Sequence, residues 1–144
     1  MAILLRFAGG ALGTFIVSDT AASARSWEQT TQENQAYATY PDEDCYVLAG
    51  TRGSLSFPTM RIKRHLHDED RSWWLPMHAE TAAVTRDDPL VRQLAHFCGV
   101  VRGEVAPLVT VQDGLHNLRV VDAIVEAART HRVVDLAAAE CAVA

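Results

Sequence analysis

Apolar residues follow two patterns along the chain: short runs in the first half and helix-spaced positions in the second. The runs Ala2–Phe7 and Leu12–Val17 flank Gly9 and Gly10, which predicts a β-hairpin. Further short strands are predicted at Cys45–Ala49, Ser54–Phe57, Met60–His67, Trp73–His78 and Val133–Leu136. In Met60–His67 the apolar and charged positions alternate with a period of two, which is typical of a half-exposed strand.

Two amphipathic helices are predicted after most of these strands. Acidic residues before Pro89 cap the first helix, and apolar residues then recur every three or four positions until Gly103 stops it. Thr110 and Asp113 have the spacing of a capping box, which opens the second helix. That helix ends in basic residues near Arg132, where positive charge suits the helix dipole.

Strands that come first, with hairpin-length connections, and helices that come last predict the α+β class. We expect an open, predominantly antiparallel β-sheet with helices packed on one face, as a single domain over residues 1–136. The alanine-rich segment 137–144 is predicted to be a disordered tail. The polar stretch Asp19–Asp44 is interpreted as a long loop with room for one irregular turn, and its large aromatic residues argue for partial order.

Composition, net charge and cysteine spacing limit which partners and which cellular compartment are expected for this chain. The 144 residues include 49% hydrophobic and 22% charged residues, which is a globular composition. A net charge of −5 argues against a nucleic-acid partner, and no apolar run is long enough to predict a membrane span. The three cysteines are widely spaced, which favours neither a disulfide framework nor a zinc site and makes the cytoplasm the expected compartment.

Three segments, in order along the chain, resemble the Gfo/Idh/MocA family of NAD(P)-dependent oxidoreductases. The hairpin Leu4–Thr14 followed by Ser18 is similar to that family's "lrF.nGa.gt…S" pattern, and the turn Gly50–Leu55 to its "G..G.l" pattern. The segment Val111–Ile124, with Val133–Leu136 after it, resembles the family's closing helix and strand. Together the three segments span nearly the whole chain.

The resemblance implies the C-terminal domain of a two-domain enzyme whose N-terminal Rossmann domain binds NAD or NADP. Here the glycines at 9–13 fall in a hairpin, so they are not the dinucleotide fingerprint, and the family's Glu-Lys-Pro segment does not occur. We therefore assign no catalytic, cofactor-binding or metal-binding residue to this chain. We expect it to represent the C-terminal part of an oxidoreductase, not catalytic by itself.

The polar segment after the hairpin is the best local candidate for a substrate-cleft wall, because its carboxylates and amides can hydrogen-bond a sugar or polyol. A full-length relative could bring this segment to its substrate. Trp74 is a further candidate, because a tryptophan can stack on a sugar ring, although one of Trp73 and Trp74 is expected in the core. The candidate cleft residues are Trp27, Glu28, Glu33, Asn34 and Trp74.

Two weaker candidates have simple structural explanations. His65 and His67 lie one residue apart on a predicted strand and could share a metal ion, but no glutamate follows at the required spacing, which favours a solvated face. Cys98 falls on the apolar stripe of a helix, which favours a buried structural thiol over a nucleophile.

The predicted function is the substrate-binding and dimerisation domain of a dehydrogenase of sugar-like or polyol substrates. Its partners are a Rossmann domain, a small polar substrate and a second copy bound through the sheet face. The alternative is a non-catalytic binding or scaffolding module that retains the fold, and an unrelated small ligand-binding protein is a more distant third.

Overall fold

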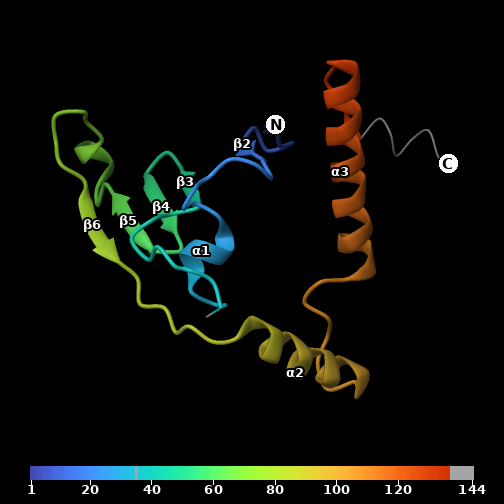
Figure 1. The fold of residues 1–144 in the computed structure, drawn as a ribbon. Helices are drawn as coiled ribbons and strands as arrows, with labels where there is room; N and C mark the ends of the chain where they lie inside the picture. Colours follow the sequence, from blue (N-terminus) through green and yellow to red (C-terminus); the bar gives the residue numbers. More distant parts are fainter. Residues whose placement is uncertain (35, 137–144) are drawn as a thin grey trace. The chain divides into compact units, whose positions relative to one another are not determined.

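The computed structural model describes residues 1–34 and 36–136. The chain forms two compact units, which are described separately (Figure 1). One unit contains Met1–Thr20 and the described residues from His96 onward, and the other contains Ala21–Ala95.

The first unit begins with the predicted hairpin. Strands β1 (Ala2–Arg6) and β2 (Leu12–Ile16) pair antiparallel along their whole length. The turn is closed by the N–H of Gly10, which donates to the carbonyl of Phe7 at 2.9 Å. Gly10 has a φ of +86°, a conformation that glycine adopts without steric cost. The glycine at this position therefore favours the tight turn that joins the two strands.

Both predicted long helices are present. Helix α2 spans Pro89–Val101, with proline at its first position, and its residues from His96 onward belong to the first unit. Helix α3 spans Val111–Thr130 and begins with the predicted capping box. The backbone N–H of Asp113 donates to the Thr110 hydroxyl at 3.2 Å, and that of Thr110 donates to the Asp113 carboxylate at 2.8 Å.

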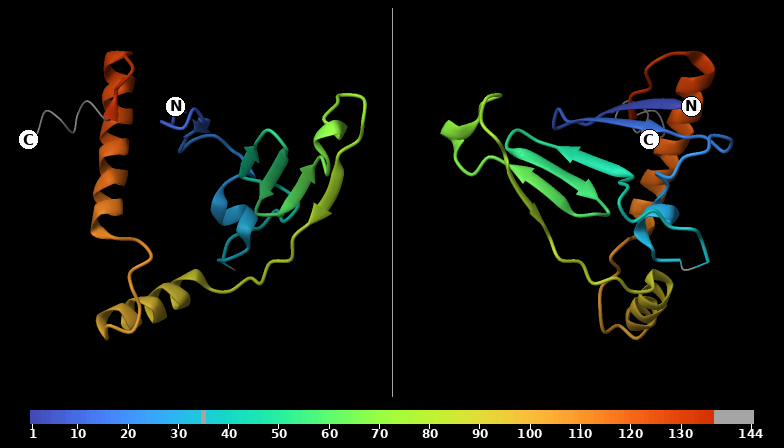
Figure 2. Two further views of the ribbon diagram at one scale, coloured as in Figure 1. Left: turned by 180° about the vertical axis from the view of Figure 1, so that it is seen from behind. Right: turned by 60° about the vertical axis from the view of Figure 1, so that its left-hand side comes forward.

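The second unit contains a four-stranded antiparallel sheet in the order β3-β4-β5-β6 (Figure 2, right). Its strands are β3 (Tyr46–Ala49), β4 (Gly53–Phe57), β5 (Arg61–Arg64) and β6 (His78–Thr81). The register places Leu48, Leu55 and Ile62 in one row across three strands, and Val47, Ser56 and Arg61 in the adjacent row on the opposite face. The α+β class and the antiparallel pairing are therefore confirmed.

A short helix interrupts the predicted loop Asp19–Asp44. Helix α1 (Trp27–Thr31) begins after Ser26, whose hydroxyl oxygen accepts a hydrogen bond from the N–H of Gln29 at 3.2 Å. Gln32 ends the helix in the left-handed conformation, with a φ of 61°. The predicted long loop, which allowed for one irregular turn, therefore contains a short helix at this position.

Strand β5 is shorter than predicted at both ends. Met60 adopts a φ of 56° in the turn before the strand, and Arg64 is the last residue, opposite Gly53 at the start of β4. A strand ends where its neighbour ends, because its backbone groups lose their partners. His65 and His67 therefore follow the strand, and His67 precedes the 3₁₀ helix η1 (Asp68–Asp70).

The strand predicted at Trp73–His78 forms later, as β6. Pro76 lacks the N–H that a ladder needs, and β5 pairs with the residues after it, from His78 to Thr81. Trp73 and Trp74 lie in a turn and are 102% and 93% exposed. The expectation that one of them is a core residue was therefore wrong.

The predicted last strand, Val133–Leu136, is also not formed, since residues 133–136 belong to no strand in the described part of the chain. The predicted tail, 137–144, lies outside the described residues. The prediction of one domain over 1–136 stays a prediction.

Burial within the described residues is slight. Only Thr30, Thr31 and Gly99 are buried in residues 1–34 and 36–136, and the described part contains no buried large apolar side chain. Cys98, predicted to be a buried thiol, is half-buried.

Candidate functional site

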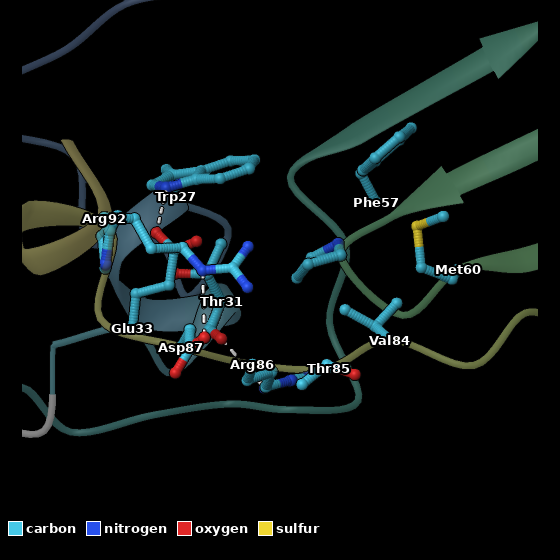
Figure 3. Close-up of a pocket in the computed structure, with 12 residues that line it drawn as sticks. Trp27, Thr31, Glu33, Phe57, Met60, Val84, Thr85, Arg86, Asp87 and Arg92 are labelled. Carbon is cyan, nitrogen blue, oxygen red and sulfur yellow. Dashed lines mark hydrogen bonds and ion pairs between the residues drawn. The ribbon is translucent and has the colours of Figure 1, made fainter. Parts of the chain in front are cut away.

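A hollow of about 220 Å³ lies within the second unit, beside helix α1 (Figure 3). Its wall comes from α1, from the turn between β4 and β5, and from the segment that leads into α2. The lining residues are Trp27, Thr31, Glu33, Phe57, Pro58, Met60, Val84, Thr85, Arg86, Asp87, Pro89 and Arg92. Figure 3 shows Trp27, Glu33 and Arg92 on one side, and Phe57, Met60 and Val84 on the other.

Trp27 is held by two contacts. Its indole N–H donates to the Glu33 carboxylate at 2.9 Å, and its ring lies 5.9 Å from that of Tyr46 on β3, tilted by 49°. The side chain remains 40% exposed, so part of the ring is open to a ligand. The hydrogen bond uses one Glu33 oxygen and leaves the other available as an acceptor.

Arg92 is oriented in a similar way from the first turns of α2. Its Nε–H donates to the Asp87 carboxylate at 2.9 Å. A guanidinium held through Nε still has donors on both terminal nitrogens. The hollow therefore has a fixed cationic donor on the same side as the Glu33 acceptor (Figure 3).

Arg86 connects the segment before α2 to the end of α1. One terminal nitrogen donates to the Thr31 carbonyl at 2.9 Å and also to the side-chain oxygen of Gln32. These contacts join residues 54 and 55 positions apart in the sequence. They explain how Asp87 and Arg92, which lie far from the predicted loop, come to share a hollow with Trp27.

Asp44 stabilises the opposite wall. Its carboxylate accepts hydrogen bonds from the backbone N–H and hydroxyl of Thr59, at 3.1 and 2.6 Å, and pairs with Arg61 at 2.6 Å. Burial by itself raises the pKa of the Asp44 carboxyl, but the hydrogen bonds from Thr59 and Arg61 outweigh burial and hold the pKa below its ordinary value of 3.8. Thr59 lies between Pro58 and Met60, so Asp44 positions two lining residues.

The structure brings together two of the five residues predicted from the sequence. Trp27 and Glu33 line the hollow, whereas Glu28, Asn34 and Trp74 are not among its lining residues. Asn34 instead uses its side-chain oxygen to accept a hydrogen bond from the N–H of Ala36 at 2.9 Å. Whether any of the five contacts a substrate stays a prediction.

Sequence reasoning missed Arg92 and Asp87. The pattern Asp87-Asp88-Pro89 was interpreted only as a helix cap, which Asp88 provides by accepting a hydrogen bond from the N–H of Leu90 at 2.8 Å. A side chain beside a capping residue has no distinct sequence signal. The Asp87–Arg92 spacing of five residues is also outside the usual helical pairs.

The two histidines weighed as metal ligands do not share a strand. His65 lines a second hollow of about 250 Å³ with His78 and Asp70, and its shielded Nδ1 has no hydrogen-bond partner. In residues 1–34 and 36–136, no group of three or more His, Cys, Asp or Glu residues has an arrangement that could hold a metal ion.

Comparison with known proteins gives the family. Residues 1–136 match the model GFO_IDH_MocA_C, described as the oxidoreductase family, C-terminal alpha/beta domain. The chain belongs to this family. No curated protein and no solved structure shows a significant match. The family match covers all three resembling segments, so the resemblance inferred from the sequence is confirmed.

Family membership implies a Rossmann partner domain in full-length relatives. The glycines at 9–13 of this chain do not suit a dinucleotide, because they turn one antiparallel strand into the next instead of joining a strand to a helix. The helices described here also include none with the length and apolar character needed to cross a membrane.

Proposed function

We propose that this domain supplies part of the substrate-cleft wall of an NAD(P)-dependent oxidoreductase that acts on sugar-like or polyol substrates. The nicotinamide, bound by the Rossmann domain of a full-length protein, supplies the hydride chemistry. The domain itself binds and orients substrate and is not catalytic alone. The observation that carries the proposal is the hollow beside α1, where the Trp27 ring lies next to the fixed polar groups of Glu33 and Arg92.

The chemistry of this wall suits a neutral, hydroxyl-rich ligand. An aromatic face packs against the C–H face of a sugar, while a carboxylate accepts and a guanidinium donates hydrogen bonds to its hydroxyls. The charged lining residues balance, since Glu33 and Asp87 are acidic and Arg86 and Arg92 are basic. A balanced wall favours neutral ligands over phosphorylated or carboxylated ones.

The same proposal includes a homo-oligomer formed through the sheet of the second unit. The row Leu48–Leu55–Ile62 is apolar, and Leu48 is 59% exposed. Burying such a row against a second copy removes apolar surface from water, which is the main favourable term in association.

Ligand binding can be tested on the 144-residue chain by NMR. Sorbitol and D-glucose are added to labelled protein, and backbone amide shifts are followed. We expect shifts confined to residues around Trp27–Glu33 and Thr85–Arg92. Trp27→Ala should weaken the affinity about three- to tenfold, because it removes the stacking ring and the partner that fixes Glu33.

Trp74→Ala is the matched control, since Trp74 is exposed and lies outside the lining residues. It should leave the affinity unchanged. If neither ligand shifts the hollow's amides, the substrate-wall proposal fails. If the chain binds partner proteins without binding either ligand, the scaffolding alternative replaces it.

A further inference from the structure

Two adjacent threonines at the end of α1 differ in their hydrogen bonds. Thr30 is 0% and Thr31 4% exposed, so both side chains are removed from water. The Thr30 hydroxyl donates to the carbonyl of Ser26 at 2.8 Å and lies 3.3 Å from that of Trp27. The Thr31 hydroxyl is shielded from solvent and has no hydrogen-bond partner.

A buried hydroxyl without a partner destabilises the protein that contains it, because its hydrogen bonds to water are lost and not replaced. Such groups are rare in folded proteins, and each one calls for an explanation. Valine has nearly the same shape without the polar atom, so packing alone does not explain a threonine here.

The position of Thr31 suggests a role. Thr31 lines the hollow, and Arg86 holds its backbone carbonyl at 2.9 Å, which fixes where the side chain begins. Threonine carries a methyl and a hydroxyl group on the same carbon, and rotation about χ1 exchanges their places. Because the hydroxyl has no hydrogen bond to lose, turning it toward a ligand sacrifices none.

We propose that Thr31 is a specificity-determining residue of the hollow, whose hydroxyl turns to hydrogen-bond one hydroxyl group of a neutral polyol or sugar. This inference rests on the proposed substrate wall and adds a polar contact beyond Trp27, Glu33 and Arg92. It predicts that a residue unfavourable in the free protein becomes favourable once ligand is bound.

The test compares Thr31→Val with Thr30→Val in the 144-residue chain. Thr31→Val should not lower Tm, because it removes an unsatisfied polar group, and should weaken sorbitol binding about three- to tenfold in the NMR titration. Thr30→Val should lower Tm, because the hydrogen bond from the Thr30 hydroxyl to the Ser26 carbonyl is lost, while the sorbitol affinity of the folded protein stays unchanged. Thr31→Ser keeps the hydroxyl and should restore wild-type affinity.

Glucose analogues that each lack one hydroxyl identify the group contacted. One analogue should bind the wild type more weakly than glucose does, and that difference should vanish in Thr31→Val. If the wild type and Thr31→Val bind sorbitol equally while Trp27→Ala binds it weakly, the Thr31 inference is overturned and the substrate wall stands. A lower Tm for Thr31→Val also overturns it. If the wild type binds no probe, the substrate wall itself fails and this inference fails with it.

Discussion

Gly53 permits a close approach between β4 and β5. A Cβ added there would lie 2.3 Å from the carbonyl oxygen of Lys63, too close for any side chain unless the backbone moves. We expect Gly53→Ala to lower the free energy of unfolding by about 2–3 kcal/mol, as steric strain at a strand pair does. Urea denaturation measures the change.

Gly50→Ala serves as the control within the same turn. Its added Cβ would meet nothing nearer than the Gly53 carbonyl oxygen at 3.8 Å, an ordinary contact. Equal destabilisation by the two substitutions would contradict the explanation from the Lys63 contact.

Asp44 makes the stability of the second unit depend on pH. Its pKa in the folded protein is lower than its ordinary value of 3.8, so its contribution is present above that value and is lost as the pH falls through the folded pKa. Asp44→Asn should lower the free energy of unfolding by about 1–3 kcal/mol at neutral pH, because hydrogen bonds to a charged group are lost. The difference from wild type should shrink steadily below about pH 4.

Asp42→Asn provides the comparison, since only the backbone carbonyl of Asp42 accepts a hydrogen bond from Arg61, at 3.2 Å. Its urea midpoint should fall much less than that of Asp44→Asn, because the Asp42 charge acts on Arg61 only through space. If Asp44→Asn lowers stability equally at acid and neutral pH, the carboxylate charge is not the cause.

At the scale of elements, capping explains where the helices begin. Ser26 and Gln29 have the Ser-x-x-Gln spacing of a capping box, and this signal could have revealed α1 inside the predicted loop. Its five residues are too few for an apolar period to appear, so the cap was the only local sign. Thr110 and Asp113 give the same signal before a long apolar pattern, and there the helix was predicted correctly.

The α3 cap should loosen in acid. Hydrogen bonds from the Thr110 hydroxyl and backbone lower the pKa of Asp113, so the cap is complete above the ordinary carboxyl pKa and is lost as the pH falls through the lowered value. The protection factors of the first-turn amides of α3, which compare the intrinsic exchange rate with the observed one, should therefore fall at low pH.

Asp113→Asn removes the titrating carboxyl, so it should abolish that pH dependence and reduce first-turn protection at neutral pH. Glu126→Gln, on the last turns of the helix, is the matched acidic control and should leave the first turn unaffected. Persistence of the pH effect in Asp113→Asn would contradict the role of the capping box.

At the scale of the whole molecule, the two faces of β3 allow a direct test of self-association. Leu48 belongs to the apolar row and Val47 to the row with Ser56 and Arg61, and the two are 59% and 67% exposed. We expect Leu48→Asp to shift the sedimentation coefficient toward the monomer, because a charge in the interface is desolvated without a partner. Val47→Asp should leave the assembly unchanged, and a monomeric wild type would contradict the oligomer proposal.

Local patterns identified the hairpin, the two long helices and the α+β class. Gly10, Pro89 and the Thr110–Asp113 pair act on their immediate neighbours, so their consequences can be predicted from sequence alone. The failures at β5, β6 and residues 133–136 share one cause. A strand ends where its partner strand ends, as β5 does where Arg64 pairs with Gly53. The sequence of one segment alone does not specify this pairing.

The candidate site depended even more on tertiary structure. The sequence indicated the polar segment that contains Trp27 and Glu33, because its side-chain chemistry is local. Only the fold placed Arg92 and Asp87 beside them, because Arg86 joins their segment to the end of α1. The fold also decided that the Thr30 hydroxyl has a hydrogen-bond partner and the Thr31 hydroxyl has none. The sequence by itself determined the family, the class of fold and the helix boundaries that caps specify, because short-range interactions encode these. Tertiary structure decided strand register, burial and the membership of the hollow, because these depend on contacts between residues far apart in the chain.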